Sequence, residues 1–164
     1  MKKTAIFYNS ITGGAREIAA ALASALKGET DALDINDVDN VDLSKYGLVV
    51  LGASTWNVGE SDEWDDFLAK LDPGAIGEVT FALYGLGDQR EFPDHFLDTM
   101  GMLYDRLMDL GATLIGQTET AGYAFRGSAA VVDGHFVGLA IDQENQPEMT
   151  PVRLKSWVER LRAA

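Results

Sequence analysis

The sequence predicts an α/β fold in which a doubly wound parallel sheet carries helices on both faces. Three apolar runs with few charges, Ala5–Tyr8, Leu48–Ala53 and Val79–Leu86, indicate strands that are covered on both sides. Amphipathic helical patterns alternate with these runs, which is typical of a parallel sheet. At 164 residues and 46% hydrophobic, the chain has the size of one domain with one core. We therefore expect a single domain over residues 1–164.

The first half of the chain supplies one clear helix, a weak strand and a second helix. Ile18, Leu22 and Leu26 share one helical face after the first strand. The segment Ala32–Ile35 is a weaker strand candidate. Trp64 begins a further helix and is expected in the core, together with the apolar residues that follow it, Phe67, Leu68 and Leu71.

The second half predicts two more helices and a strand that is split by an insertion. Thr150 and Pro151 form a helix start, with the threonine as cap and the proline in the first turn. The segment Gln117–His135 is rich in Thr, Gly and Ala, and it separates the apolar fragments Ala112–Ile115 and Phe136–Ile141. It is therefore expected to be an insertion that splits the last strand. The apolar stripes of the two helices are Phe96, Met100, Leu103, Leu107 and Leu110, and Leu154, Trp157, Val158 and Leu161.

Composition excludes several kinds of chemistry and partner. The chain has 13 basic and 26 acidic side chains and a net charge of -13, so it should repel nucleic acid and anionic lipid and attract basic proteins. It has no cysteine, which excludes disulfides, thiolate nucleophiles and iron–sulfur ligation. Redox chemistry would therefore need a bound organic cofactor. Because no apolar run approaches about 18 residues, we expect a cytoplasmic protein without membrane insertion.

The loop between the first strand and the first helix is a candidate phosphate site. Backbone N–H groups at the helix start and the hydroxyls of Ser10 and Thr12 would bind a phosphate, and Gly13 and Gly14 would let the backbone approach it. A simple helix cap is the alternative interpretation. The expected phosphate-binding residues are Ser10, Ile11, Thr12, Gly13, Gly14 and Ala15.

Two aromatic residues follow the next two strands, Trp56 after Leu48–Ala53 and Phe92 after Val79–Leu86. Both loops should lie at the carboxyl edge of the sheet, where a flat ring system could stack between the two side chains. Packing in the core is the alternative for each ring. A phosphate site next to a planar-ring site suggests a mononucleotide cofactor.

Other polar residues near these loops have ordinary alternatives. Asp88 and Asp94 could serve a turn and a helix start, and His95 could be a first-turn residue. The only other histidine is His135, so a metal site has little support.

Together, the three loops resemble those of the long-chain flavodoxins, and the likeness runs from Lys3 to Leu161. The motifs fall in family order: Ser10-x-Thr12-Gly13, residues 54–60, residues 85–89, residues 93–96, Gly122-Tyr123, residues 136–140 and Asn145-Gln146. The resemblance implies a flavodoxin-like fold with five parallel strands in the order 2-1-3-4-5. It also implies noncovalent FMN, with its phosphate on the first loop and its isoalloxazine ring between Trp56 and Phe92.

The resemblance extends to further site residues and to the function. The backbone around Trp56–Gly59 would meet the flavin N5 edge, the Gly87–Gln89 turn would meet the pyrimidine end, and Glu144 would lie near the ribityl chain. The function implied is low-potential transfer of single electrons by a monomer, without catalytic residues. The reductase donor would be a flavodoxin/ferredoxin reductase, and the acceptor nitrogenase, a photosystem or a radical-activating enzyme. The cofactor residues expected beyond the first loop are Ser54, Thr55, Trp56, Asn57, Val58, Gly59, Gly87, Asp88, Gln89, Phe92, His95, Phe96 and Glu144.

Simple electrostatics agrees with a low redox potential, because a reduced anionic flavin is disfavoured between apolar rings in a protein with a net charge of -13.

The chain departs from the family pattern in a few places. Ala15 replaces a usual threonine, which removes a phosphate hydrogen bond of about 0.5–3 kcal/mol. Arg16 could compensate electrostatically. Phe92 replaces a usual tyrosine, and the loop Gly59–Trp64 is one residue shorter than usual.

Two other functions are compatible with the sequence. The first is an FMN-dependent NAD(P)H:quinone reductase on the same fold, although no basic pocket for the dinucleotide is evident. The second is a flavin-free interaction module. A phosphoacceptor receiver is disfavoured, because the third strand ends in Gly52, Ala53, Ser54 and Thr55 without an aspartate.

Overall fold

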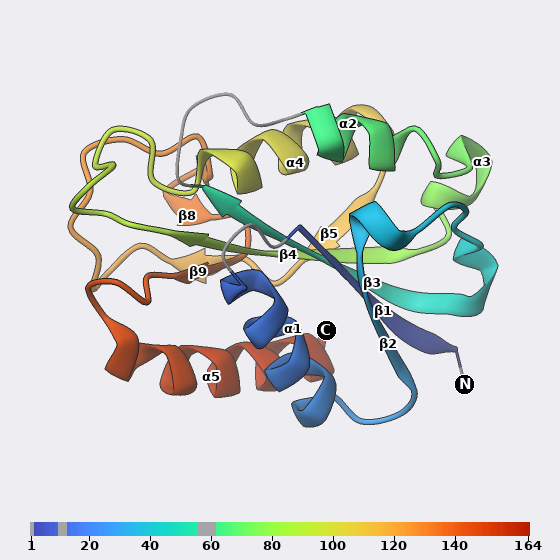
Figure 1. Cartoon of the computed structure of the whole chain (residues 1–164), viewed down its shortest axis with the longest axis horizontal. Coiled ribbons are helices and arrows are strands. Elements are labelled where there is room, and N and C mark those ends of the chain that lie inside the picture. The colour runs from blue at the N-terminus through green and yellow to red at the C-terminus, as the bar shows by residue number, and fades with distance from the viewer. Residues whose placement is uncertain (1, 10–12, 56–61) are drawn as a thin grey trace.

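The computed structural model describes residues 2–9, 13–55 and 62–164. Its main sheet is parallel, with the strand order β2-β1-β3-β4-β5, and a further strand, β9, also pairs with β4 (Figure 1). The expected doubly wound sheet and its strand order are confirmed. The strands are β1 (Lys3–Tyr8), β2 (Thr30–Asp34), β3 (Tyr46–Thr55), β4 (Thr80–Gly87), β5 (Thr113–Ile115) and β9 (Leu139–Ile141).

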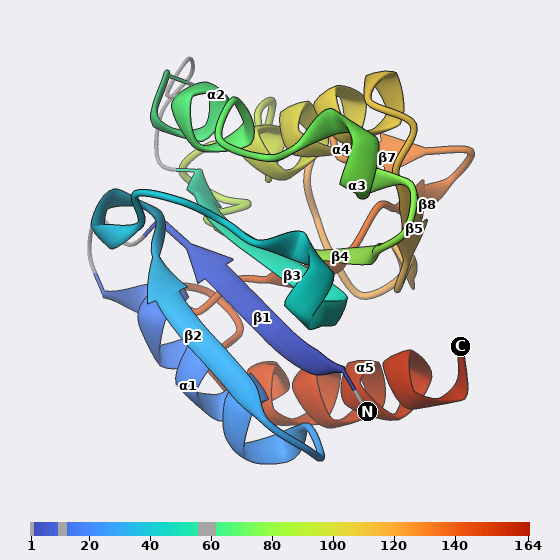
Figure 2. The same cartoon turned by 90° about the vertical axis from the view of Figure 1, so that its right-hand side faces the viewer.

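Helices cover both faces of this sheet. Figure 2 shows α1 (Gly14–Ala25) and α5 (Thr150–Ala163) on one face, and α2 (Asp62–Leu68), α3 (Pro73–Ile76) and α4 (Asp98–Asp109) on the other. Short 3-10 helices, η1 (Ile35–Asp37), η2 (Leu43–Lys45) and η3 (Pro147–Met149), lie in the connections. None of the helices in the described ranges has the length and apolar character needed to cross a membrane.

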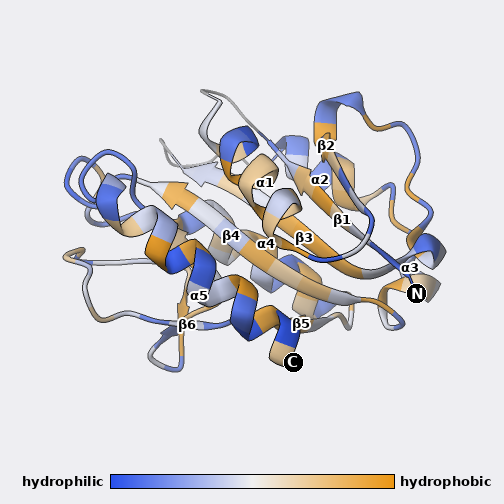
Figure 3. Cartoon of the chain, turned by 90° about the horizontal axis from the view of Figure 1, so that it is seen from below, coloured by the Kyte–Doolittle hydropathy of each residue, from blue (hydrophilic) through white to orange (hydrophobic). Residues whose placement is uncertain are grey.

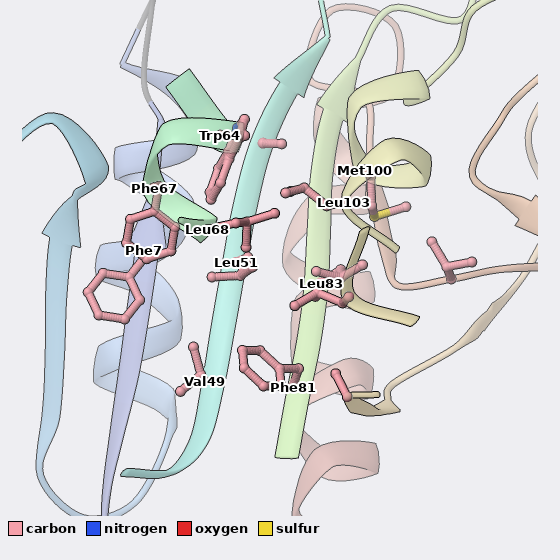
Figure 4. Close-up of a cluster of buried hydrophobic side chains, with 14 of the residues drawn as sticks. Phe7, Val49, Leu51, Trp64, Phe67, Leu68, Phe81, Leu83, Met100 and Leu103 are labelled. Carbon is pink, nitrogen blue, oxygen red and sulfur yellow. The ribbon is translucent and has the colours of Figure 1, made fainter. Parts of the chain in front are cut away.

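The larger core lies between the sheet and the helices α2 and α4. Trp64 is buried there as expected, and its ring meets that of Phe67 edge to face, at a centroid distance of 5.8 Å. Phe67 in turn contacts Phe7 of β1 at 5.0 Å (Figure 4). These rings exclude water from one face of β1 and β3, and a second core covers the other face, which explains why the strands read as continuous apolar runs.

The second core lies between the other face of the sheet and the helices α1 and α5. Ile18 and Leu22 of α1 and Trp157 of α5 are buried in it. The Trp157 indole nitrogen donates to the carbonyl of Gly116 at 2.8 Å, which ties α5 to the end of β5. Figure 3 shows α5 with hydrophilic and hydrophobic residues in alternation along its length, as expected for a helix with one buried side.

The last strand is split, as the sequence predicts. β5 pairs with β4 from Thr80 to Ala82, and β9 pairs with β4 from Tyr84 to Leu86, so both pieces share one neighbour. The chain between them forms a small antiparallel sheet in the order β6-β8-β7. Its strands are β6 (Thr118–Glu119), β7 (Val131–Val132) and β8 (His135–Phe136).

The structure corrects some details of these predictions. Phe136 belongs to β8 of the small sheet and does not continue into β9, so the fragment expected as one strand is divided. Thr150 is the first residue of α5 and its hydroxyl donates to the Gln143 side chain, so it is not the cap. Leu110 lies just beyond α4 and is 39% exposed.

Candidate functional site

The carboxyl ends of β1, β3 and β4 lie side by side at one edge of the sheet. Tyr8 pairs with Gly52, and Thr55 pairs with Gly87, so the loops that follow the three strands leave the sheet at neighbouring points. The strand order reverses between β1 and β3. In open α/β sheets, ligands bind beyond the carboxyl ends of strands at such a reversal.

The amino end of α1 follows β1 at this edge. Gly13 precedes the helix in the left-handed conformation, with φ of 91°, and the cap makes no side-chain hydrogen bond. A Cβ on Gly14 would lie 2.8 Å from the Leu86 side chain, so the first turn packs closely on β4. Ala15 is buried. The expected residues Ser10, Ile11 and Thr12 lie outside the described residues.

The end of β3 carries two buried hydroxyl groups. The Thr55 hydroxyl oxygen accepts a hydrogen bond from the Thr99 N–H at the start of α4, at 3.1 Å. The Ser54 hydroxyl is buried and has no hydrogen-bond partner among the described parts of the chain. Because buried polar groups are normally hydrogen-bonded, this hydroxyl suits a polar ligand group. The predictions for Trp56, Asn57, Val58 and Gly59 fall outside the residues that are described.

Asp88 organises the turn after β4. Its carboxylate accepts hydrogen bonds from the N–H groups of Arg90 and Glu91, at 3.0 and 2.9 Å, and from the Asn145 side chain at 2.7 Å. Partial burial raises the pKa of Asp88, but the hydrogen bonds from Glu91, Asn145 and Arg90, with the Arg90 charge, outweigh burial and hold the pKa below its usual value. Asp88 therefore has the turn role that its sequence position allowed.

Gln89 links this turn to two other segments. It is buried, and its side-chain nitrogen and main-chain N–H both donate to Asp142, the residue that follows β9. The Gln89 side-chain oxygen accepts a hydrogen bond from the N–H of Ala124 in the insertion. Sequence reasoning missed Asp142, although it follows an apolar strand fragment just as the predicted loops do. The Gly87–Gln89 turn is thus held by β9 and by the insertion together.

Phe92 is half-buried on a loop that the insertion supports. Its N–H donates to the carbonyl of Asp88 at 2.9 Å. The N–H groups of Arg126 and Gly127 both donate to the carbonyl of Pro93, at 2.7 and 2.9 Å. The Arg126 guanidinium also pairs with Asp94 at 2.8 Å. The backbone on either side of Phe92 is therefore fixed.

The remaining predicted residues have different surroundings. His95 is exposed, and its Nδ1 lies 2.9 Å from a carboxylate oxygen of Asp98. The Phe96 ring is completely buried among the rings of Tyr123, Phe125 and Phe136. Glu144 is exposed. Of these side chains, Phe96 lies in the core behind the loop, whereas His95 and Glu144 lie at the surface.

Acidic side chains border this edge of the sheet. The first turn of α2, which follows the loop after β3, carries Asp62, Glu63 and Asp65. The Glu63 carboxylate accepts a hydrogen bond from the Asn9 side chain just beyond β1, at 2.6 Å. Asp65 pairs with Arg106 of α4 at 2.7 Å. A positively charged partner would therefore meet complementary charge here.

A doubly wound parallel sheet, with a glycine-led helix start at the carboxyl edge of its strands, defines an open α/β protein. The chain belongs to the flavodoxin family, because the family model described as Flavodoxin matches residues 6–157. It is 39% identical to the flavodoxin of Synechocystis sp., over 99% of this chain and 97% of that protein. It is also 39% identical to flavodoxin 1 of Escherichia coli K12, over 98% of this chain and 93% of that protein.

Solved structures agree with this assignment. The crystal structure of Fusobacterium nucleatum flavodoxin bound to flavin mononucleotide superposes with a TM-score of 0.87, at 30% identity, over 99% of this chain and 98% of that one. The short-chain flavodoxin associated with a non-canonical PDU bacterial microcompartment matches at a TM-score of 0.69 and 20% identity, which shows the fold alone.

Proposed function

We propose that this chain binds FMN noncovalently at the carboxyl edge of its sheet and carries single electrons from a reductase to a redox enzyme. One observation carries the proposal. The strands β1, β3 and β4 end side by side at this edge, in a chain whose Fusobacterium nucleatum relative is described as bound to flavin mononucleotide. FMN would supply the redox chemistry, and the protein would hold it and control its surroundings.

The described residues suit such a ligand in distinct ways. The start of α1 at Gly13 and Gly14 offers N–H groups and a positive helix end to a phosphate. The Ser54 hydroxyl, which has no hydrogen-bond partner among the described residues, suits a polar group of the cofactor. The fixed turn at Gly87–Gln89 would present backbone groups to the polar edge of the ring. The other residues proposed to bind FMN are Ser10, Ile11, Thr12, Ala15, Thr55, Trp56, Asn57, Val58, Gly59, Phe92, His95, Phe96 and Glu144.

Charge explains why the bound cofactor should have a low potential. Full reduction places negative charge on the flavin, and a protein of net charge -13 with an acidic rim, formed by Asp62, Glu63 and Asp65 of α2, opposes that charge. The same rim should attract basic-surfaced redox partners. We propose a flavodoxin/ferredoxin reductase as the donor, and nitrogenase, a photosystem or a radical-activating enzyme as the acceptor.

The first experiment tests the cofactor and the one-electron function. When apoprotein and FMN are mixed in a titration, binding should quench the flavin fluorescence, and the quenching should be complete at one equivalent of FMN. Riboflavin should bind more weakly because it lacks the phosphate. Anaerobic titration of the complex with dithionite should then show two separate one-electron stages. Failure to take up FMN would favour a flavin-free interaction module. Steady oxidation of NADPH by the protein alone would favour the quinone reductase.

The second experiment tests the acidic rim as the partner surface. Reduction by a basic reductase should slow as salt is added, because salt screens the attraction between exposed charges. Asp62→Lys should slow this reduction at low salt, since Asp62 is exposed at the start of α2. Glu159→Lys on α5 is the matched control, with the same change of charge at an exposed position elsewhere. Equal slowing by both variants would contradict a rim-specific encounter.

A further inference from the structure

Tyr84, in the middle of β4, makes a buried hydrogen bond to the first turn of α1. Its side chain is 0% exposed, and its hydroxyl donates to the carbonyl oxygen of Ala15 at 2.7 Å. We propose that Tyr84 is a positioning residue for the cofactor phosphate, because it fixes the first turn of α1 against the sheet. This inference rests on the proposed function, since the phosphate concerned is that of FMN.

A glycine on the neighbouring strand makes this contact possible. Gly52 of β3 is the direct register partner of Tyr84. A Cβ on Gly52 would lie 1.9 Å from the Tyr84 ring carbon Cζ, far closer than atoms can approach. The missing side chain leaves space over β3, and the tyrosine ring fills it. The Tyr84 hydroxyl thereby reaches the carbonyl of Ala15 in the first turn of α1.

The first turn of α1 rests on β4 at a second point. A Cβ on Gly14 would lie 2.8 Å from Cδ2 of Leu86, which is two residues beyond Tyr84 on β4. Side chains two apart on a strand share one face, so Tyr84 and Leu86 support consecutive parts of the same turn. Leu86 provides an apolar contact, and Tyr84 provides the directional hydrogen bond.

The residues at Gly13 and Ala15 add no side-chain hydrogen bond to this turn. The residue that precedes α1 is Gly13, and the cap makes no side-chain hydrogen bond. Ala15 is fully buried but ends in a methyl group, so its side chain cannot hydrogen-bond. A helix start without a side-chain cap loses stabilisation that serine, threonine or aspartate would provide. The Tyr84 hydroxyl, on the neighbouring face of the sheet, supplies a hydrogen bond to this turn.

The hydroxyl stays protonated over the whole physiological range. Burial raises the pKa of Tyr84 well above its usual value, and nearby Tyr8 raises it further. The Ala15 carbonyl therefore keeps its donor. A fixed first turn keeps its N–H groups in a constant direction, and anion binding at a helix start depends on that direction.

The test compares two ligands that differ only by the phosphate. In Tyr84→Phe, the ring still fills the space over Gly52, but the hydrogen bond to Ala15 is lost. We expect the FMN dissociation constant to rise about 3- to 10-fold, while the riboflavin constant changes less than about twofold. Amide hydrogen exchange in the first turn of α1 should become faster in the variant.

Tyr46→Phe is the matched control. The Tyr46 hydroxyl also makes a tertiary hydrogen bond, to Asp31 at 2.9 Å, but Tyr46 begins β3 and so lies at the opposite end of that strand from the site. Urea unfolding of both apoproteins reports the general stability cost. The control should leave the ratio of FMN to riboflavin affinity unchanged.

The outcomes separate the inference from the proposed function. If the wild-type protein binds FMN but Tyr84→Phe weakens FMN and riboflavin equally, or changes neither, the positioning role is overturned and the proposed function stands. The same holds if Tyr46→Phe lowers the ratio as much as Tyr84→Phe does. If the wild-type protein binds no FMN, both the proposed function and this inference fail.

Discussion

The carboxylate of Asp142 accepts two hydrogen bonds from Gln89, one from the side-chain nitrogen at 2.7 Å and one from the main-chain N–H at 3.1 Å. Asp142 is 0% exposed, and Asn145 donates to it as well. Within residues 2–9, 13–55 and 62–164, no ion pair compensates its charge. The carboxylate is therefore solvated by amide groups, which join the turn after β4 to the end of β9.

The first prediction concerns this carboxylate. Asp142→Asn places an NH2 group among donors from Gln89 and Asn145, so at least one donor loses its acceptor. We expect the apoprotein to lose about 2–4 kcal/mol of unfolding free energy. Urea unfolding measures this loss, with Glu148→Gln as an exposed control for removal of one negative charge. A loss no larger than that of the control would contradict the prediction.

The second prediction concerns the contact between α4 and the insertion. A Cβ on Gly101 would lie 2.3 Å from the carbonyl carbon and oxygen of Ala129, and backbone cannot move aside as a side-chain tip can. Gly101→Ala should therefore destabilise the protein by about 1–3 kcal/mol, despite the better helix propensity of alanine. Gly77→Ala is the control, since no atom lies within 4 Å of its Cβ position and its φ is -67°. Thermal unfolding should show a clear loss for Gly101→Ala alone.

The third prediction concerns stability at high pH. Burial, followed by the hydrogen bond to Asp31, raises the pKa of Tyr46 from 10.0 to about 12. Burial, opposed by Arg153, likewise raises the pKa of Tyr123 to about 12. The unfolded chain loses these protons first, so stability is retained below pH 10 and falls as the pH rises through about 12.

Urea unfolding between pH 8 and pH 12 would measure this fall, and phenolate absorbance would report the ionisation directly. Tyr46→Phe removes one contributing group, so its stability should depend less steeply on pH above 10. A wild-type stability that stays constant across this range would refute the assignment.

The fourth prediction concerns Arg16, at the start of α1. Its guanidinium lies 3.9 Å from the Asp34 carboxylate and 6.0 Å from the centre of the Tyr8 ring. A positive charge beside the proposed phosphate site should favour a phosphate electrostatically. Arg16→Glu should weaken FMN binding by about 3- to 10-fold and leave riboflavin binding nearly unchanged.

Fluorescence titration of the variant with each flavin checks this. Lys27→Glu, which reverses a charge just beyond the other end of α1, is the control. If both substitutions weaken FMN equally, the effect is one of overall charge and not of position.

The architecture could be predicted because the strands are buried on both faces. β1, β3 and β4 coincide closely with the apolar runs, and the weak candidate at Ala32–Ile35 corresponds to β2, which ends at Asp34. The buried sides of the helices could be predicted because apolar residues recur with helical periodicity on the side that faces the core. The split of the last strand was also visible, since a polar, glycine-rich segment separates its two apolar pieces.

Individual polar partners could not be predicted in the same way. Tyr84 and Ala15 are 69 residues apart, and Gln89 and Asp142 are 53 apart, so no local pattern connects them. In the sequence Tyr84 is one more apolar residue of a strand, and only the fold shows where its hydroxyl lies. The residues expected to bind a cofactor remain predictions, and those at 10–12 and 56–59 lie outside the described ranges.

β4 has two collinear neighbours along a single edge. β5 occupies the first half of that edge and β9 the second, and Gly138 lies so close to β4 that a Cβ there would be 2.0 Å from the carbonyl of Leu83. The chain can therefore leave the sheet after Ile115 and return at Leu139 without changing the order of any strand. Both ends of the insertion therefore join one edge of β4, and the strand order of the sheet is the same as it would be without the excursion.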